Sequence, residues 1–366
     1  MTFCFVFGLE PWLLPPAVEM IEALKSSGHG VKVIYAVYQG SKPDKKDFNT
    51  SDIFEIVSKH PGAKRLFIHH FIAASVKKLL AQSSVDVIIA CDILSLQAVN
   101  EIKGPVKGYW GFEIVSRPEK MKLSLGIYRA FRFPAWVENC DFFLSPSESR
   151  GDKISARCKK NIPHEVIYNC RLLKEGTGSV SGTPGKLVYT GRISETQYIS
   201  EIIDAIALVP GNVELHLAGP VDAGYECTLV EKIKNNSLSH KVFLLGRLSR
   251  EDAYALIDTA DIGFVFYNEN MGPEAQDPAP NKLSDYIAGN TWTLGGDQPY
   301  MKYWLEERGA GLCIKTMDSK SIADGIKELL NAPQFKDKAL LHQVYKNELN
   351  MYVQAEKLVM LVNTLI

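Results

Sequence analysis

Short apolar runs alternate along the chain with segments in which apolar residues recur at helical spacing. Apolar runs of this kind are typical of strands in parallel sheets that helices cover on both faces. The first half predicts a strand at 3–7, a helix at 16–27 that Gly28-His29-Gly30 ends, and a strand at 31–37. Further strands of this half are expected at 85–91, 106–110, 142–145 and 165–168.

The alternation restarts in the second half, with helical segments between the apolar runs. Strands are expected there at 186–190, 213–218, 241–245, 262–266, 291–294 and 311–314. The segment 174–185 between the halves is the only Gly/Ser/Thr-rich stretch of its length, which indicates an interdomain linker. Two doubly wound α/β domains that face each other would form a cleft at the carboxyl ends of both sheets.

The length of 366 residues also favours two domains. We expect an N-terminal domain at 1–172, a linker at 173–185 and a C-terminal domain at 186–344. The last segment, roughly 340–365, is helical and apolar, so that residues 345–366 are expected to cover a surface of the first domain.

The composition excludes several classes of protein. The apolar fraction of 46% is that of a globular chain, and the net charge of −1 gives no basic excess for nucleic-acid binding. Seven cysteines without a Cys-x-x-Cys pair argue against a zinc site and for a reducing compartment. The run 3–7 is too short for a signal peptide, and no run of about 18 apolar residues occurs. We therefore expect a soluble, cytoplasmic protein, attached to a membrane surface at most.

The segment 280–290 carries the clearest candidate chemistry. Pro280 fits the first position of a helix, and the free amides after it attract phosphate oxygens. Lys282 could add a mobile positive charge, and Asp285, one turn further, could accept hydrogen bonds from sugar hydroxyls. This layout suits a nucleotide sugar, although an ordinary helix start would explain the segment equally well.

Other segments place this one in a familiar order. Five pieces follow one another at 187–193, 215–220, 242–248, 260–265 and 280–289. Together they resemble the GT-B-fold glycosyltransferases, and among these the retaining enzymes of glycosyltransferase family 4. No piece is specific alone, but five in register make a strong joint signal. The first half resembles the family more loosely, through the Gly8 loop, the Gly28-His29 helix end and the strand entry at 140–142.

The resemblance implies roles for several residues of the second half. Arg192 would bind the donor diphosphate with its paired N–H groups, and Gly219, in the family's strand-Gly turn, would be among the donor-binding residues. Asp285 would hold the nucleotide ribose, while the backbone at Arg247 and Leu248 would read the base. Tyr267 ends a buried strand and is expected to form a wall of the site. The amides that would face the phosphates belong to Asn281, Lys282 and Leu283.

In the first half, Gly8 follows a strand, where it permits a ligand to approach or simply makes a tight turn. The family's matching loop lies near the donor phosphates and the acceptor. Glu113 could touch the acceptor hydroxyl, or it could be a carboxylate at a helix start. His69-His70 have no metal-ligand spacing and are interpreted as structural.

The chain departs from the family in two places. The family's lysine that follows the Gly-Arg pair is missing, because residues 194–197 read Ser-Glu-Thr-Gln. Either Lys282 supplies that charge or diphosphate binding is weakened. The family's two glutamates eight positions apart are matched by Asp277 and Asp285, which reach less far. Asp277 is chosen on spacing, since Glu269 and Glu274 lie in the same loop.

The segment 120–136 interleaves basic and aromatic residues. It could contact an anionic membrane surface, as in relatives with lipid-linked acceptors, or form a helix with a solvated basic side. No Gly-x-Gly-x-x-Gly pattern follows a strand, which argues against a nicotinamide cofactor. The family is described as metal-independent, so that no metal and no other cofactor are expected.

These features favour a retaining glycosyltransferase of bacterial type. It would move a sugar from a UDP- or GDP-linked donor to a hydroxyl acceptor, such as a glycan or a lipid-linked acceptor of capsule or lipopolysaccharide synthesis. Two alternatives remain open: a nucleotide-sugar epimerase of the same fold, which needs proton-transfer groups in the cleft, and a non-catalytic partner protein.

Overall fold

The computed structural model describes residues 1–38, 53–58, 64–113, 125–172, 185–268, 272–331 and 337–366. The chain divides into two compact units. Unit 1 contains residues 1–168 and 351–366, and unit 2 contains residues 169–350. The predicted linker at 173–185 lies outside the described residues except for Gly185. No helix in the described ranges is long and apolar enough to cross a membrane.

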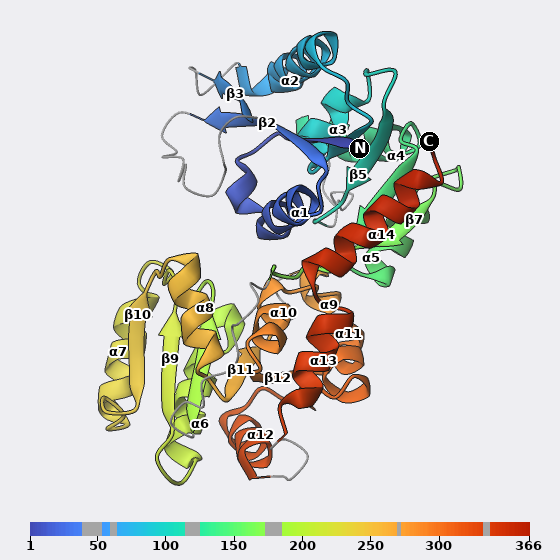
Figure 1. The fold of residues 1–366 in the computed structure, drawn as a ribbon. Coiled ribbons are helices and arrows are strands. Elements are labelled where there is room, and N and C mark those ends of the chain that lie inside the picture. Colours follow the sequence, from blue (N-terminus) through green and yellow to red (C-terminus); the bar gives the residue numbers. More distant parts are fainter. Residues whose placement is uncertain (39–52, 59–63, 114–124, 173–184, 269–271, 332–336) are drawn as a thin grey trace. The chain divides into compact units, whose positions relative to one another are not determined.

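Unit 1 is built on a seven-stranded sheet with the order β3-β2-β1-β4-β5-β6-β7 (Figure 1). All of its strand pairs are parallel. Its strands are β1 (Thr2–Phe7), β2 (Gly30–Tyr38), β3 (Ile53–Ser58), β4 (Val87–Ala90), β5 (Val106–Trp110), β6 (Phe142–Ser145) and β7 (His164–Val166). Its helices are η1 (Pro11–Leu13), α1 (Pro15–Ser26), α2 (Lys64–Gln82), α3 (Ile93–Val99), α4 (Leu125–Val137), α5 (Glu148–Ser155) and α14 (Met351–Asn363).

Unit 2 repeats this topology with six parallel strands in the order β10-β9-β8-β11-β12-β13 (Figure 1). Its strands are β8 (Lys186–Thr190), β9 (Glu214–Ala218), β10 (Val242–Gly246), β11 (Ile262–Val265), β12 (Trp292–Gly296) and β13 (Gly311–Ile314). Its helices are η4 (Glu195–Gln197), α6 (Ile199–Leu208), α7 (Tyr225–Asn235), α8 (Arg250–Asp258), α9 (Pro273–Gln276), α10 (Asn281–Ala288), α11 (Pro299–Lys302), η6 (Tyr303–Glu307), α12 (Ser319–Asn331) and α13 (Ala339–Asn347).

Both sheets reverse their strand order next to their first strand, between β1 and β4 and between β8 and β11. The central strands are continuous apolar runs because helices cover them on both faces, and β1 is buried from Phe3 to Phe7. In open α/β sheets, ligands bind outside the carboxyl ends of the strands at such a reversal. The fold therefore directs attention to the carboxyl ends of β8 and β11.

Every strand expected from the sequence is present, within a few residues at each end. The edge strand β3 was not expected from the sequence. The expected C-terminal helical segment consists of two helices, α13 and α14, with a break at residues 348–350. The break has a physical reason, since α13 packs on α10 in unit 2 whereas α14 packs on α1 in unit 1.

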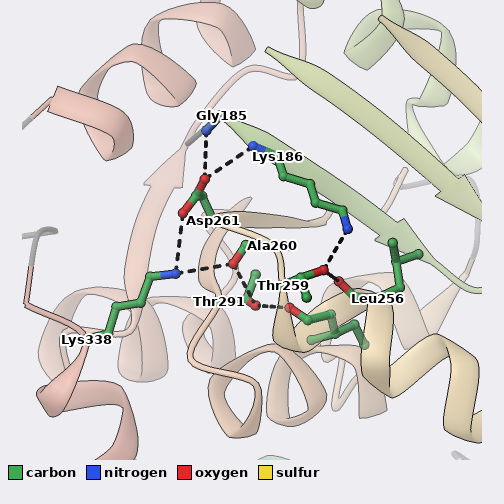
Figure 2. A network of polar contacts seen from close by, with 9 residues as sticks. Gly185, Lys186, Leu256, Thr259, Ala260, Asp261, Thr291 and Lys338 are labelled. Carbon is green, nitrogen blue, oxygen red and sulfur yellow. Dashed lines mark hydrogen bonds and ion pairs between the residues drawn. The ribbon is translucent and has the colours of Figure 1, made fainter. Parts of the chain in front are cut away.

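A polar network ties the amino ends of the unit 2 strands together (Figure 2). The Asp261 carboxylate accepts hydrogen bonds from the backbone N–H groups of Gly185 (2.8 Å) and Lys186 (3.2 Å). The ammonium of Lys338, just before α13, lies 3.5 Å from the same carboxylate. The Thr291 hydroxyl donates to a carbonyl at the end of α8 at 2.7 Å. This edge of the sheet is thus fixed by structural contacts, and it lies opposite the edge where a ligand is expected.

Candidate functional site

Glycine turns bring the backbone close together at the carboxyl edge of the unit 2 sheet. Gly191 donates its N–H to the carbonyl of Ala218 at 2.9 Å, and Gly219 donates to Gly246 at 2.8 Å. Gly191 and Gly219 have φ angles of 122° and 150°. A Cβ atom on Gly219 would lie 1.7 Å from the Gly191 carbonyl oxygen. Only glycine allows this approach, so the predicted Gly219 turn is a requirement of the backbone itself.

Lys282 lies beside this edge and is held by side chains of unit 2. Its Nζ donates to the hydroxyl of Tyr189 at 3.0 Å and lies 3.4 Å from Oε1 of Gln197. The same Nζ lies 4.1 Å from the centre of the Tyr189 ring. A Cβ on Gly191 would be 3.6 Å from it. The lysine that was expected to be mobile is thus fixed at the end of β8.

The surroundings of the Lys282 ammonium are neutral. Desolvation lowers the pKa of Lys282 from its ordinary value to about 7. Burial also raises the pKa of Tyr189 well above its ordinary value, so that this phenol is uncharged beside the ammonium. Because the half-buried side chain is partly withdrawn from water, a cation there attracts an anion more strongly than an exposed cation does.

The tip of α10 differs in one detail from the prediction. Pro280 is the N-cap of the helix, with φ −74° and ψ 131°, and Asn281 is its first residue. Pro280 was expected inside the helix, but its extended ψ places it just before. The Leu283 N–H donates to the Pro280 carbonyl at 3.3 Å, which occupies one of the three amides expected to face phosphates. Asp285 is half-buried one turn further, as its spacing requires.

Tyr286 fastens α10 to the end of β8. Its hydroxyl accepts a hydrogen bond from the backbone N–H of Thr190 at 3.1 Å. Its ring fills the space over Gly263, where an added Cβ would lie 2.4 Å from a ring carbon. The helix that carries Lys282 and Asp285 therefore has a fixed place relative to the sheet edge.

Arg192 lies in the loop after β8, as expected, and forms an ion pair. Its Nε donates to Oδ1 of Asp222 at 2.6 Å, and a terminal nitrogen donates to Oδ2 at 3.1 Å. The pair raises the pKa of Arg192. The side chain of Arg192 remains 75% exposed, so that part of its guanidinium is open to a ligand.

Asp277 lies in the segment that leads into α10 and is buried. Next to it, Ala279 accepts a hydrogen bond from the side-chain amide of Asn169 at 2.9 Å. Asn169 is itself buried, and among the described residues its Oδ1 has no hydrogen-bond partner. An unsatisfied buried acceptor costs free energy. The hydrogen bond that the Asn169 amide donates to Ala279 offsets part of this cost and ties Asn169 to the loop before α10.

The other candidates of unit 2 lie at the same edge of the sheet. Arg247 is exposed and Leu248 is half-buried, directly after the Gly246 turn of β10. Tyr267 is half-buried after β11. The residue after it, Asn268, donates its N–H to Thr196 at 3.1 Å, which joins the end of β11 to the loop that carries Gln197.

Gly8 and Glu113 belong to unit 1. The Gly8 N–H donates to the Asp92 carboxylate at 2.6 Å, and a Cβ on Gly8 would lie 2.4 Å from Leu94. Asp92 also caps α3 and is half-buried, and desolvation raises its pKa. Gly8 is therefore required by packing, whatever its part in binding. Glu113 is exposed after β5, at the end of a described range.

The basic and aromatic segment 120–136 is described from Tyr128 onward for its side chains. On α4, Phe133 and Trp136 are buried, whereas Tyr128 is 49% and Phe131 77% exposed. Arg132, beside Phe131, is exposed as well. The helix thus has both a core-facing side and an exposed side with aromatic and basic residues.

His69 and His70 lie on α2 with their ring centres 4.0 Å apart. In the part of the chain that the structure describes, no group of three His, Cys, Asp or Glu side chains is placed to hold a metal ion. The seven cysteines all lie in the described ranges, and none of them forms a disulfide.

Four residues of this region were not expected from the sequence: Tyr189, Gln197, Asp222 and Asn169. Each acts through a contact with a residue far away in the chain, for example the 93 positions between Tyr189 and Lys282. Tyr189 had one signal in the sequence, since it is a side chain with a polar hydroxyl near the end of a buried apolar strand.

Known proteins resemble this chain in sequence and in fold. Residues 177–348 match the family described as Glycosyl transferases group 1. Unit 2 is a glycosyltransferase domain of this family. The match covers nearly all of unit 2 and includes the glycine turns, Arg192 and the helix α10. The chain is thus a glycosyltransferase, and the resemblance to the GT-B-fold glycosyltransferases is confirmed, whereas the likeness to the retaining enzymes of family 4 stays a prediction.

Solved structures extend the likeness to the whole chain. A lipopolysaccharide outer core galactosyltransferase, WaaB, has 13% identity and a TM-score of 0.71, with 100% of both chains covered. HepE of Anabaena, in complex with UDP and glucose, gives the same values. Sucrose-phosphate synthase of Thermosynechococcus elongatus has 14% identity and a TM-score of 0.73, covering 100% of this chain and 99% of that one. At such identities the likeness shows the GT-B fold. No curated protein sequence matches the chain.

Proposed function

We propose that this glycosyltransferase is a retaining enzyme that uses a UDP-linked sugar and transfers it to a hydroxyl group of a cell-surface glycan or lipid-linked acceptor. The observation that carries the proposal is the fixed Lys282 ammonium at the carboxyl end of β8, next to Arg192 and the tip of α10. Two cations and a helix N-terminus belong to this edge of the sheet, and this combination suits a diphosphate.

The chemistry follows from where charge develops. As the bond between sugar and phosphate breaks, negative charge accumulates on the departing diphosphate. Lys282, Arg192 and the first amides of α10 would stabilise this charge, which lowers the barrier. In a front-face mechanism, the departing phosphate takes the proton of the acceptor hydroxyl, so that no protein base is needed. Asp285 would hold the ribose, and the backbone at Arg247 and Leu248 would contact the base.

UDP is favoured over other nucleotides because several of the similar structures were solved with UDP or a UDP-linked sugar. HepE was solved with UDP, with UDP and glucose, and with UDP-glucose. A pneumococcal O-GlcNAc transferase of the same fold was solved with UDP and GlcNAc. The identities of 10–13% leave the sugar and the nucleotide to experiment.

The test is calorimetric binding of UDP, GDP and ADP to the wild-type chain and to Asp285→Ala. Asp324→Ala on α12 is the matched control, because Asp324 is an exposed aspartate in an ion pair with Lys327 on the same unit. UDP should bind to the wild type and the control, and binding should be lost or at least tenfold weaker in Asp285→Ala. If none of the three nucleotides binds, the donor site is not functional and the chain is a non-catalytic partner protein.

The epimerase alternative is separated by product analysis. A transferase consumes a donor such as UDP-glucose only slowly without an acceptor, through hydrolysis. An epimerase converts the donor alone into an isomer with the same mass. Formation of an isomeric nucleotide sugar from purified UDP-glucose would replace the transferase assignment.

We further propose that the exposed side of α4 contacts anionic lipid, which would place the cytoplasmic enzyme at the inner face of a membrane. Tyr128, Phe131 and Arg132 support this proposal by their exposure next to one another. In vesicle flotation, Phe131→Ser should reduce binding to phosphatidylglycerol vesicles. Phe71→Ser on α2, where Phe71 is 48% exposed, should leave it unchanged. Equal binding to phosphatidylcholine vesicles would contradict the electrostatic part of the idea.

A further inference from the structure

At the end of β8, the Lys282 ammonium contacts two side chains, those of Tyr189 and Gln197. Tyr189 is buried on this strand and is 1% exposed, and Gln197 of η4 is 6% exposed. Neither residue carries a charge. For Lys282, the structure gives contacts with these two side chains and with no carboxylate among the described residues. The Lys282 side chain is half-buried, and an ammonium that is partly withdrawn from water without an anionic partner is unfavourable, unless an anion reaches it during function.

The hydroxyl of Tyr189 has a particular position in this group. It donates to the backbone carbonyl of Arg192 at 2.7 Å, while its lone pairs accept from the Lys282 ammonium at 3.0 Å. One hydroxyl therefore connects Lys282 with the turn that carries Arg192. These are the two cations of the proposed diphosphate site, and they come from parts of the chain 90 residues apart.

We propose that Tyr189 is a positioning residue that sets the place of both cations, and that Gln197 keeps the Lys282 site neutral so that an arriving diphosphate supplies its counter-charge. The inference rests on the proposed function and deepens it. It adds that binding of the donor diphosphate is coupled to uptake of a proton by Lys282.

The coupling follows from charge and burial. In the free protein the pKa of Lys282 is about 7, so roughly three quarters of the molecules carry the neutral amine at pH 7.5. A dianionic diphosphate beside the amine favours the charged form and raises its pKa again. Binding at pH 7.5 should therefore take up about 0.8 proton, and at pH 6 about 0.1.

Other charged groups on the neighbouring elements do not account for this behaviour. Arg192 is paired with Asp222, and its pKa is raised. The carboxylates carried by the neighbouring segments are Glu195 of η4, Asp285 of α10 and Asp277 before α10, and none of them is among the contacts that the structure gives for Lys282. The tyrosines of the site titrate above it.

The experiment measures proton uptake on binding of UDP-glucose, whose diphosphate has no titration of its own near neutral pH. Calorimetry in buffers of different ionisation enthalpy gives the number of protons, from pH 6 to pH 8.5. For the wild type we expect the uptake given above and an affinity that falls about thirtyfold from pH 6 to pH 8.5.

Two variants separate positioning from mere stability. Tyr189→Phe keeps the ring and removes the hydroxyl, and should weaken UDP-glucose binding at least about tenfold, as for a lost hydrogen bond to a charged group. Its matched control is Tyr345→Phe, which removes a buried hydroxyl that donates to a backbone carbonyl at 3.1 Å in the same unit. Gln197→Glu supplies a carboxylate, so Lys282 should be charged before binding and uptake at pH 7.5 should fall below about 0.2 proton.

The outcomes distinguish this inference from the proposed function. If UDP-glucose binds without proton uptake, or if Tyr189→Phe behaves like Tyr345→Phe, the inference is wrong and the donor site stands. If UDP-glucose does not bind at all, the proposed donor is wrong. In that case an NMR titration of ¹³Cε-labelled lysine in the free protein, assigned with Lys282→Met, decides. A Lys282 signal that titrates near 10 refutes the inference, and one near 7 that rises in Gln197→Glu supports it.

Discussion

The substitution Gly219→Ala gives the sharpest prediction, because Gly219 makes a very close backbone approach at the proposed donor site. The new Cβ would lie 1.7 Å from the carbonyl oxygen of Gly191, so that one of the two turns must move. A φ of 150° is also unfavourable for alanine. Backbone strain of about 1–2 kcal/mol and overpacking of about 1–3 kcal/mol add to a loss of about 2–5 kcal/mol in the free energy of unfolding. The shifted turn carries Arg192, so UDP binding should also be lost.

Gly211→Ala is the matched control, since Gly211 has a φ of 92° and no atom within 4 Å of its added Cβ. Gly211→Ala has the backbone strain of a positive φ but no steric clash. It should lower the free energy of unfolding by about 1–2 kcal/mol and leave the UDP affinity unchanged. Urea unfolding measures the first quantity and calorimetry the second. If Gly219→Ala binds UDP as well as Gly211→Ala does, the apposed turns do not form the donor site.

Three further substitutions test single contacts. Asp222→Asn removes the carboxylate that neutralises Arg192, so the UDP affinity measured by calorimetry at low salt should rise about two- to fivefold. A fall in affinity would show instead that the carboxylate orients the arginine. Asn169→Asp replaces the amide that donates to Ala279, and should cost about 1–3 kcal/mol in urea unfolding and weaken UDP binding. Asp261→Asn, in the network of Figure 2, should lower the free energy of unfolding by a similar amount and leave the UDP affinity unchanged. Any loss of UDP binding would contradict a purely structural role of Asp261.

The fold could be predicted because its strands are buried on both faces and appear as continuous apolar runs. The edge strand β3 escaped notice, since Ile53–Ser58 includes a glutamate and follows a long polar stretch. Edge strands have fewer neighbours, so their sequences carry a weaker signal. The break between α13 and α14 was also hidden, because the two helices meet different units and no proline or glycine marks the change.

The candidate site could be predicted only where a local motif carries it. Lys282 and Asp285 were found from their places after Pro280, and Arg192 from its place after a strand and a glycine. Their partners could not be found in this way. The register of β8 beside β9 and the packing of α10 decide that Tyr189 meets Lys282, and local spacing contains neither.

The lowered pKa of Lys282 makes protein stability and donor affinity depend on pH in opposite directions. Its pKa is about 7 in the folded protein and 10.5 as the ordinary value, so above pH 7 the unfolded chain binds more protons. Lys282 therefore makes the free energy of unfolding rise with pH from about 7 toward 10. Donor affinity falls over the same range, because the neutral amine predominates. Urea unfolding of the wild type and of Lys282→Met between pH 6.5 and 9 isolates this contribution, since other groups cancel. The wild type should gain on the variant as pH rises; a constant difference would mean that Lys282 is charged throughout, and that its neutral surroundings do not govern the site.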